Sequence, residues 1–246
     1  MKHRDRTGRS LPADVIRPER RFEITEAYKL IRTNIMFSLL KDGCKKIVIS
    51  SSQSREGKTT TAINVAVSLS QTDARVLLID ADLRKPRVGQ FFDYKEAPGL
   101  TNYLGKLVSL PEALHQTEFS NLSVLCSGVS VPNPSELLAS EKASSFLTEI
   151  ESSYDYIVID TPPLNVVADA LPLIKLSDGV VLVVRERYST FPQLNQSIRN
   201  VELIGGKILG MVLNDSKSMS KGLDQYKKYG YGSAYYDTYT TQPTVH

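Results

Sequence analysis

The chain has 246 residues, of which 41% are hydrophobic and 23% charged, and its formal net charge at pH 7 is +3. This composition is typical of one soluble globular domain with a substantial core. The small net charge gives no reason to expect a nucleic-acid partner, and no apolar run approaches the roughly 20 residues that span a bilayer. Cys44 and Cys126 lack metal-ligand spacing and fit reduced thiols, so a cytoplasmic protein is expected.

The chain begins with a polar segment. Residues 1–21 carry seven basic and three acidic side chains without an apolar period, which predicts a basic flexible arm. From residue 23 to residue 40 the apolar positions recur at helical spacing, so an amphipathic helix is expected there. This helix would pack on the domain or on a neighbouring subunit.

Short β-branched runs then alternate with helical stretches. Strands are predicted over 46–50, 75–80, 122–126, 156–160, 179–184 and 207–214, and helices over 58–70, 134–152 and 191–203. This alternation predicts an α/β fold with a doubly wound, mostly parallel sheet and helices on both faces. We expect one domain over 22–214, followed by a flexible tyrosine-rich tail over 215–246.

The segment 52–59 follows the first predicted strand and opens a helix, as a Walker A phosphate loop does. In such a loop the backbone amides of Ser54, Arg55, Glu56, Gly57 and Thr60 would cradle phosphates. Lys58 would reach the β- and γ-phosphates of ATP, and the Thr59 hydroxyl would bind Mg²⁺. Ser52 replaces the usual first glycine. The alternative is a chance Gly-Lys-Thr at a helix start, against which the order strand, loop, helix argues.

Carboxylates follow two further strands. Asp80 and Asp82 end one strand and Asp160 ends another, and the carboxyl ends of parallel strands meet at one edge of the sheet. Asp160 and Asp80 are therefore predicted to hold Mg²⁺. Asp82 is left as a base that could accept the proton of a tyrosine hydroxyl. The alternative is that these aspartates only cap turns.

Seven segments together resemble the bacterial tyrosine kinases of capsular and extracellular polysaccharide synthesis, which are P-loop NTPases. The matching segments are 26–34, 56–61, 77–86, 127–128, 132–138, 160–163 and 212–214. The resemblance implies that Lys58, Thr59, Asp80, Asp82 and Asp160 serve Mg²⁺ and ATP, and that Asn214 contacts the base. A cap or turn role for Asn214 is an equal alternative. The family has Pro-Gly where this chain has Ser54-Arg55, so turnover could differ.

Six of the twelve tyrosines lie in the last 21 residues: Tyr226, Tyr229, Tyr231, Tyr235, Tyr236 and Tyr239. Packing does not explain this cluster, although aromatic self-association would be an alternative. The resemblance implies that these tyrosines are autophosphorylated after the tail enters the site of a neighbouring subunit. It further implies contacts through Glu26, Lys29 and Arg32 in a homo-oligomeric ring, for which an octamer is a candidate size. Plain core packing of this helix with a solvated charged face is the alternative.

The resemblance also implies partners. These are a separate membrane-anchored activator that recruits the kinase to the inner face of the cell membrane, a cognate tyrosine phosphatase and protein-tyrosine substrates. Two alternative functions keep the same fold: a partitioning-type regulatory ATPase and a nucleotide switch without tyrosine transfer. The former usually carries a signature lysine early in the loop, where this chain has Ser52 and Gln53, and neither explains the tyrosine tail.

Overall fold

The computed structural model describes residues 22–94 and 96–215. The arm predicted for 1–21 lies outside the described residues. So does the tail from residue 216 onward, with all six candidate phosphorylation sites: Tyr226, Tyr229, Tyr231, Tyr235, Tyr236 and Tyr239.

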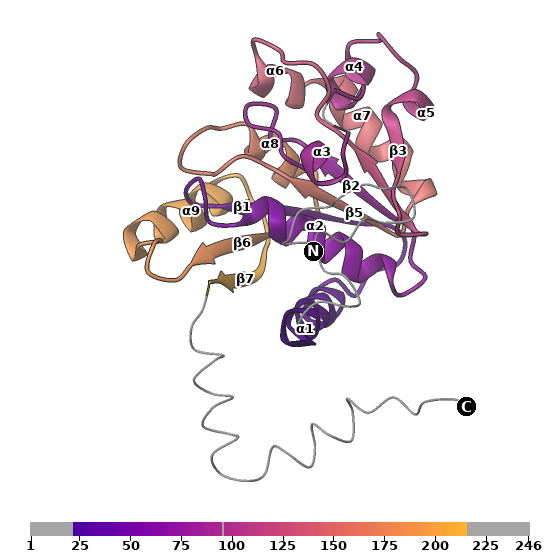
Figure 1. The fold of residues 1–246 in the computed structure, drawn as a ribbon. Coiled ribbons are helices and arrows are strands. Elements are labelled where there is room, and N and C mark those ends of the chain that lie inside the picture. Colours follow the sequence, from indigo (N-terminus) through magenta and orange to yellow (C-terminus); the bar gives the residue numbers. More distant parts are fainter. Residues whose placement is uncertain (1–21, 95, 216–246) are drawn as a thin grey trace, which may run out of the picture.

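The described part of the chain forms one seven-stranded sheet with helices on both sides (Figure 1). The strand order is β3-β4-β2-β5-β1-β6-β7, and each neighbouring pair is parallel except β3 with β4. The strands are β1 (Lys45–Ser51), β2 (Val76–Asp80), β3 (Leu114–Gln116), β4 (Leu122–Leu125), β5 (Tyr156–Asp160), β6 (Gly179–Arg185) and β7 (Ile208–Asn214). The predicted doubly wound α/β architecture is confirmed.

Two hydrophobic clusters, one on each face, hold the helices to this sheet. The helices are α1 (Phe22–Ser38), α2 (Lys58–Ser70), α3 (Val88–Phe91), α4 (Leu100–Leu104), α5 (Leu110–Ala113), α6 (Pro134–Leu138), α7 (Glu141–Glu149), α8 (Ala170–Lys175) and α9 (Phe191–Leu203). In β1, Ile47 and Ile49 face α1 and α2, whereas Val48 belongs to the cluster under α4, α7 and α8. Because side chains alternate along a strand, each central strand contributes to both cores.

The predicted single helix over 134–152 is wrong. The structure breaks it into α6, α7 and a 3₁₀ turn (Ile150–Ser153), because Ser140 adopts an extended backbone (φ −68°, ψ 151°) and starts a new helix. The Ser140 hydroxyl accepts a hydrogen bond from the Ala143 amide at 3.2 Å, which is the contact of an N-cap. Strand β3 and helix α8 were not expected, since three and six residues are too few for a readable period.

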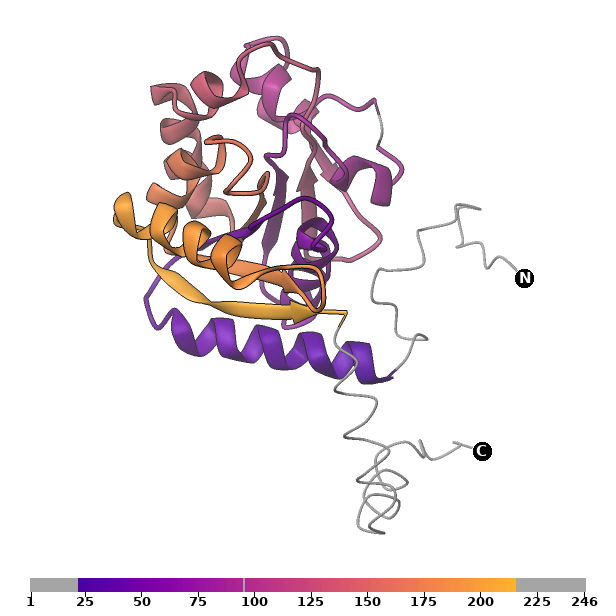
Figure 2. The same cartoon turned by 90° about the vertical axis from the view of Figure 1, so that its left-hand side faces the viewer.

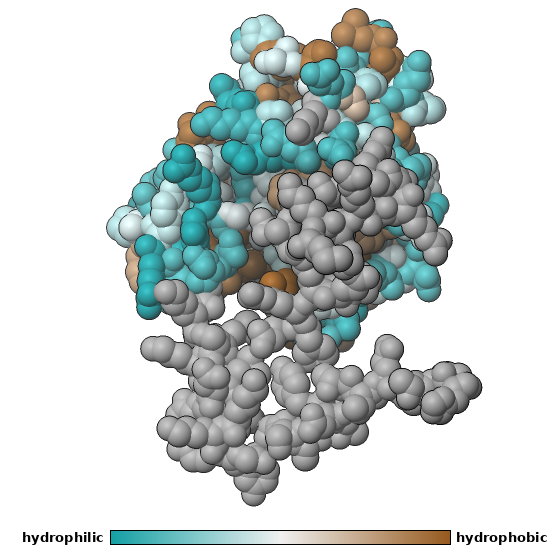
Figure 3. Space-filling model, in the orientation of Figure 1, coloured by the Kyte–Doolittle hydropathy of each residue, from teal (hydrophilic) through white to brown (hydrophobic). Residues whose placement is uncertain are grey.

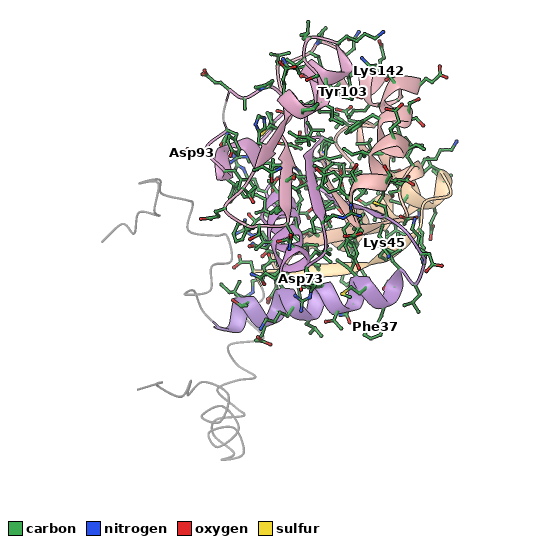
Figure 4. The ribbon with its side chains drawn as sticks, turned by 90° about the vertical axis from the view of Figure 1, so that its right-hand side faces the viewer. Phe37, Lys45, Asp73, Asp93, Tyr103 and Lys142 are labelled. Carbon is green, nitrogen blue, oxygen red and sulfur yellow. The ribbon has the colours of Figure 1, made fainter. Side chains whose placement is uncertain are left out.

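Helix α1 packs on α2 through the buried Ile35 and Leu39, and the Arg32 guanidinium donates to the Ser68 carbonyl of α2 at 2.8 Å. Figure 2 shows α1 running along the margin of the sheet beside β7. On its outer side Phe37 points away from the body of the molecule and is 71% exposed (Figure 4). None of the described helices is both long and apolar enough to cross a membrane.

We expect Ser140→Ala to lower the free energy of unfolding by about 1 kcal/mol, because the first turn of α7 loses its side-chain cap. Ser145→Ala, at an exposed position of the same helix, is the matched control and should be neutral or slightly stabilising. Urea titration followed by circular dichroism measures both. Equal effects of the two substitutions would contradict the N-cap role.

Candidate functional site

The loop between β1 and α2 ends at a helix N-terminus that no side chain caps. Gly57 precedes α2 with a φ of 94°, and no side chain caps the N-terminus of this helix. Uncapped amides at the start of a helix, together with the helix dipole, form an anion site. The loop predicted to cradle phosphates therefore has the backbone geometry for it.

Buried side chains brace this loop from within. The Glu56 carboxylate, fully buried, accepts a hydrogen bond from the Gln53 amide at 2.8 Å and a second one from the Ser189 hydroxyl. Ser52, in place of the usual glycine, is buried and accepts a hydrogen bond at 2.9 Å from Ser197 of α9. The Glu56 side chain is thus turned into the loop, so only its backbone amide is available to a phosphate.

The end of β7 closes one side of the loop. The Asn214 amide donates to the Glu56 carbonyl at 3.0 Å, and a Cβ at Gly57 would lie 2.1 Å from the same amide nitrogen. Asn214 therefore lies directly against the loop and is bonded to its backbone. Arg185 of β6 adds a hydrogen bond from its guanidinium to the Arg55 carbonyl at 3.3 Å.

Lys58 lies between two of the predicted carboxylates. Its Nζ is 2.8 Å from Asp82 Oδ2 and 3.4 Å from Asp160 Oδ1, and the Thr59 hydroxyl donates to Asp160 Oδ2 at 2.7 Å. Burial alone would lower the pKa of Lys58, but the charges of Asp160 and Asp82 outweigh it and raise that pKa. The ammonium therefore stays charged.

Asp80 sits opposite Asp160 in the register of β2 and β5. Its Oδ2 accepts hydrogen bonds from the Arg87 and Val88 amides at 3.0 and 2.9 Å, while its Oδ1 accepts one longer bond, 3.3 Å, from the Asp82 amide. Burial, and next the charge of Asp160, raise the pKa of Asp80 to about 7. Asp80 thus both caps the following turn, as the alternative expected, and stands in the charged cluster.

The two carboxylate oxygens of Asp82 have different partners. Oδ1 accepts a hydrogen bond from the Lys85 amide at 3.1 Å, which is a turn contact, and Oδ2 pairs with Lys58. The side chain is 6% exposed, whereas the side chain of Asp160 is fully buried. Of these two carboxylates, only Asp82 reaches solvent.

The donor set suits Mg²⁺ bound together with a phosphate. Among the described residues no group of three His, Cys, Asp or Glu side chains could hold a metal alone. Mg²⁺ characteristically takes one or two carboxylates and completes its shell with waters and substrate phosphates. The Thr59 hydroxyl at the start of α2 and the Asp160 carboxylate at the end of β5 are 2.7 Å apart. Together they offer such a partial shell.

Several residues around this site were not predicted as functional. They are Arg84, Ser135, Asp169, Arg185, Ser189 and Ser197. Arg84 and Ser135 fall inside segments already singled out in the sequence, but their partner Asp169 follows no strand and belongs to no motif. Only the folded chain brings these residues together.

Comparison with known proteins agrees with this geometry. A family model described as an AAA domain matches residues 44–210. The tyrosine-protein kinase YwqD of Bacillus subtilis is 39% identical over 207 residues, which cover 84% of this chain and 85% of the relative. The chain belongs to the bacterial tyrosine kinases.

Solved structures support the same assignment to this kinase family. The chimerical protein CapA2B2 has a TM-score of 0.77 at 34% identity, covering 81% of this chain and 88% of that one. The kinase domain of the Escherichia coli tyrosine kinase ETK has a TM-score of 0.74 at 29% identity, covering 77% and 74% of the two chains.

Arg55 occupies a backbone position that favours glycine. Its φ is +68°, in the left-handed region. We expect Arg55→Gly to raise the free energy of unfolding by about 0.5–1 kcal/mol, because the Cβ no longer crowds the backbone. Arg55→Ala is the control, since it removes the same charge but keeps the Cβ. Chemical denaturation that shows equal stabilities for the two variants would refute the strain.

A second prediction concerns Asp80 in the kinase free of metal and nucleotide. Because the pKa of Asp80, about 7, lies above the ordinary value of an aspartate, 3.8, the folded chain binds more protons than the unfolded one between these values. The free energy of unfolding then falls as pH rises through this window. We expect Asp80→Asn to gain thermal stability relative to the wild type between about pH 5 and about pH 8.

The exposed Asp42 provides the control, since Asp42→Asn removes one aspartate away from the charged cluster. Thermal melts in EDTA measure both variants. A pH-independent difference for Asp80→Asn would show that Asp80 ionises normally in the fold.

Proposed function

We propose that this chain is an ATP-dependent protein-tyrosine kinase that autophosphorylates its C-terminal tyrosine cluster. The observation that carries the proposal is the position of Lys58, bonded to Asp82 and Asp160 at an uncapped helix N-terminus. Such a cluster supplies a cation for phosphates, a carboxylate for a metal and a further carboxylate for a proton. The family of the chain supports the same reaction.

In this proposal the phosphates of ATP lie on the amides of residues 54–60. The Lys58 ammonium exchanges Asp82 and Asp160 for the β- and γ-phosphate oxygens, which it neutralises. Thr59, Asp160 and Asp80 would hold Mg²⁺, the two aspartates lying opposite each other on β5 and β2. When bound, Mg²⁺ would neutralise the negative charge that develops on the phosphate. Asn214, against the loop at Glu56, would contact the base.

Release of Lys58 from Asp82 also frees the carboxylate that we assign as the base. A tyrosine hydroxyl has a pKa near 10, so its oxygen becomes a better nucleophile as Asp82 accepts its proton. The new bond joins the tyrosine oxygen to the γ-phosphorus. The bond from that phosphorus to the β–γ bridging oxygen breaks, and ADP leaves with the electron pair. Asp82 suits this step because, unlike Asp160, it reaches solvent.

Transfer between subunits would need contacts that hold neighbours together. Glu26 and Lys29 form a half-exposed ion pair at 2.7 Å, and the Arg32 guanidinium is bonded to the Ser68 carbonyl. Exposed Leu30 and Phe37 add apolar area to the same helix. We propose that Glu26, Lys29, Arg32 and these two side chains contact the next copy in a homo-oligomeric ring, with an octamer as the candidate size.

The remaining elements of the proposal concern partners. We propose that a membrane-anchored activator recruits the kinase to the inner face of the cell membrane, and that a cognate tyrosine phosphatase reverses its action. Each phosphorylated tail tyrosine gains about −1.5 to −2 charges, so repulsion within the tail would loosen a docked ring. The cycle would regulate capsular or extracellular polysaccharide synthesis and export.

Transfer between copies can be tested with two variants of the chain. The acceptor is Lys58→Met with an intact tail, and the donor is active protein that lacks residues 225–246. After incubation with Mg-ATP and the activator's cytoplasmic fragment, we expect phosphotyrosine on the acceptor tail, mapped by mass spectrometry. A donor that also carries Asp82→Asn should transfer about 100-fold more slowly, because general base catalysis is lost.

The control mixes the Lys58→Met acceptor with a donor that carries Lys58→Met as well, and it should give no label. Release of free phosphate without phosphotyrosine would favour the alternative of a regulatory ATPase or nucleotide switch. Labelling of full-length wild type without labelling of the acceptor would leave only transfer within one subunit.

A further inference from the structure

The buried carboxylate of Asp169 joins three segments at the carboxyl ends of the strands. Asp169, at the start of α8, is fully buried and receives two hydrogen bonds from the Arg84 guanidinium, Nε to Oδ2 at 2.7 Å and Nη2 to Oδ1 at 3.1 Å. The Ser135 hydroxyl at the start of α6 donates to the same Oδ1. Arg84, Asp169 and Ser135 are here named the clasp.

The clasp is built as a strong interaction. Fork-shaped pairing of a guanidinium with a carboxylate is specific in geometry, and burial of the carboxylate strengthens it. Burial by itself would raise the pKa of Asp169, but the hydrogen bonds from Arg84 and Ser135 outweigh it and lower that pKa. The carboxylate therefore stays ionised and requires its partner.

Arg84 is two residues beyond Asp82, within the turn that Asp82 itself closes. The Lys85 amide, adjacent to Arg84, donates to Asp82 Oδ1 at 3.1 Å. On the far side of the turn, Asp80 holds the Arg87 and Val88 amides. The turn is thus fixed at its end by Asp80 and at its middle by the clasp, and Oδ2 of Asp82 is aimed at Lys58 at 2.8 Å.

We infer that the clasp positions Asp82 for its role as the base in tyrosine transfer, so that Arg84 and Asp169 are positioning residues of the reaction. The inference rests on the proposed function. Without the clasp the middle of the turn keeps only its own contact, from the Lys85 amide to Asp82 Oδ1. That contact would open more often and let the Asp82 carboxylate move. A displacement of about 1 Å at a reacting group can cost about 100-fold in rate.

A second arginine–aspartate pair lies at the opposite ends of the strands and can serve as a control. Arg75 donates from Nε and Nη2 to Asp155 at 3.3 and 3.1 Å, just before β2 and β5 begin. This pair also joins an arginine to an aspartate between two segments, but it lies at the amino ends of the strands, opposite the site. Loss of either pair removes one ionic contact, and only loss of the clasp should affect transfer.

The test uses full-length wild type, Arg84→Gln and Arg75→Gln as kinases, with isotope-labelled full-length Lys58→Met chain as acceptor. We expect Arg84→Gln to lower kcat for acceptor phosphorylation by about tenfold or more, while the Kd for a fluorescent ATP analogue changes less than about threefold. Arg84→Lys, which keeps the charge but not the fork, should recover part of the rate. Arg75→Gln should leave kcat unchanged.

Amide hydrogen exchange gives a readout that does not depend on activity. We expect the Lys85 amide to exchange about tenfold faster in Arg84→Gln than in wild type or Arg75→Gln. Should Arg84→Gln unfold because Asp169 is left unpaired, the double variant Arg84→Gln with Asp169→Asn removes the buried charge and is measured instead. The same loss of kcat is expected from it.

Unchanged kcat in Arg84→Gln, or a slowed reaction with unchanged exchange at Lys85, would overturn the inference. An equal loss of kcat in Arg75→Gln would do so as well. If wild type forms no phosphotyrosine, the proposed function fails on its own. Faster exchange at Lys85 would then still support the clasp as the element that fixes Asp82, and unchanged exchange would refute it.

Discussion

The structure of the site depends on one concentration of charge: three aspartates and a single lysine at the carboxyl edge of a parallel sheet. Asp80 and Asp160 are opposite each other on adjacent strands and fully buried. Burial raises the pKa of both carboxyls, and the charge of Asp160 raises that of Asp80 further. Lys58 offsets part of this negative charge. The excess that remains is what a divalent cation would neutralise, and it explains why a fold would keep a costly cluster in its interior.

This charge cluster needs a rigid frame, and the frame is made of contacts between segments far apart in the sequence. Ser197 and Ser189 brace the phosphate loop from the region of α9, and Asn214 closes it from the end of β7. On the other side, Asp169 holds the turn that carries Asp82. Most of the face visible in Figure 3 is hydrophilic where grey atoms do not cover it.

Sequence reasoning reached the parts of this structure that have a local period or a motif. The central strands, α2 and α9 were readable because continuous apolar runs and helical spacing persist over five or more residues. Lys58, Asp80, Asp82 and Asp160 followed from strand ends and the loop pattern. The break at Ser140 was missed because a serine cap looks like any other polar residue of a helix until its backbone turns extended.

The frame could not be predicted in the same way. Asp169 is one acidic residue in a loop, and nothing local distinguishes it from a solvated side chain; its role arises from Arg84 and Ser135, which are 85 and 34 residues away along the chain. For Arg55, the sequence showed that the residue is unusual at this position of the loop. It did not show the positive φ that makes the residue destabilising. Local pattern therefore locates the candidate reacting groups, whereas their alignment depends on long-range hydrogen bonds.

Nucleotide binding and catalysis would be coupled through Lys58. Phosphate oxygens would compete with Asp82 and Asp160 for the three N–H donors of the Lys58 ammonium. Phosphate binding would therefore draw Lys58 away from Asp82 and leave that carboxylate free to accept a proton. Asp82 would then keep its position only through the turn contact with Lys85 and the clasp behind it. The base would become available at the moment the phosphate arrives, without any movement of the strands that carry both groups.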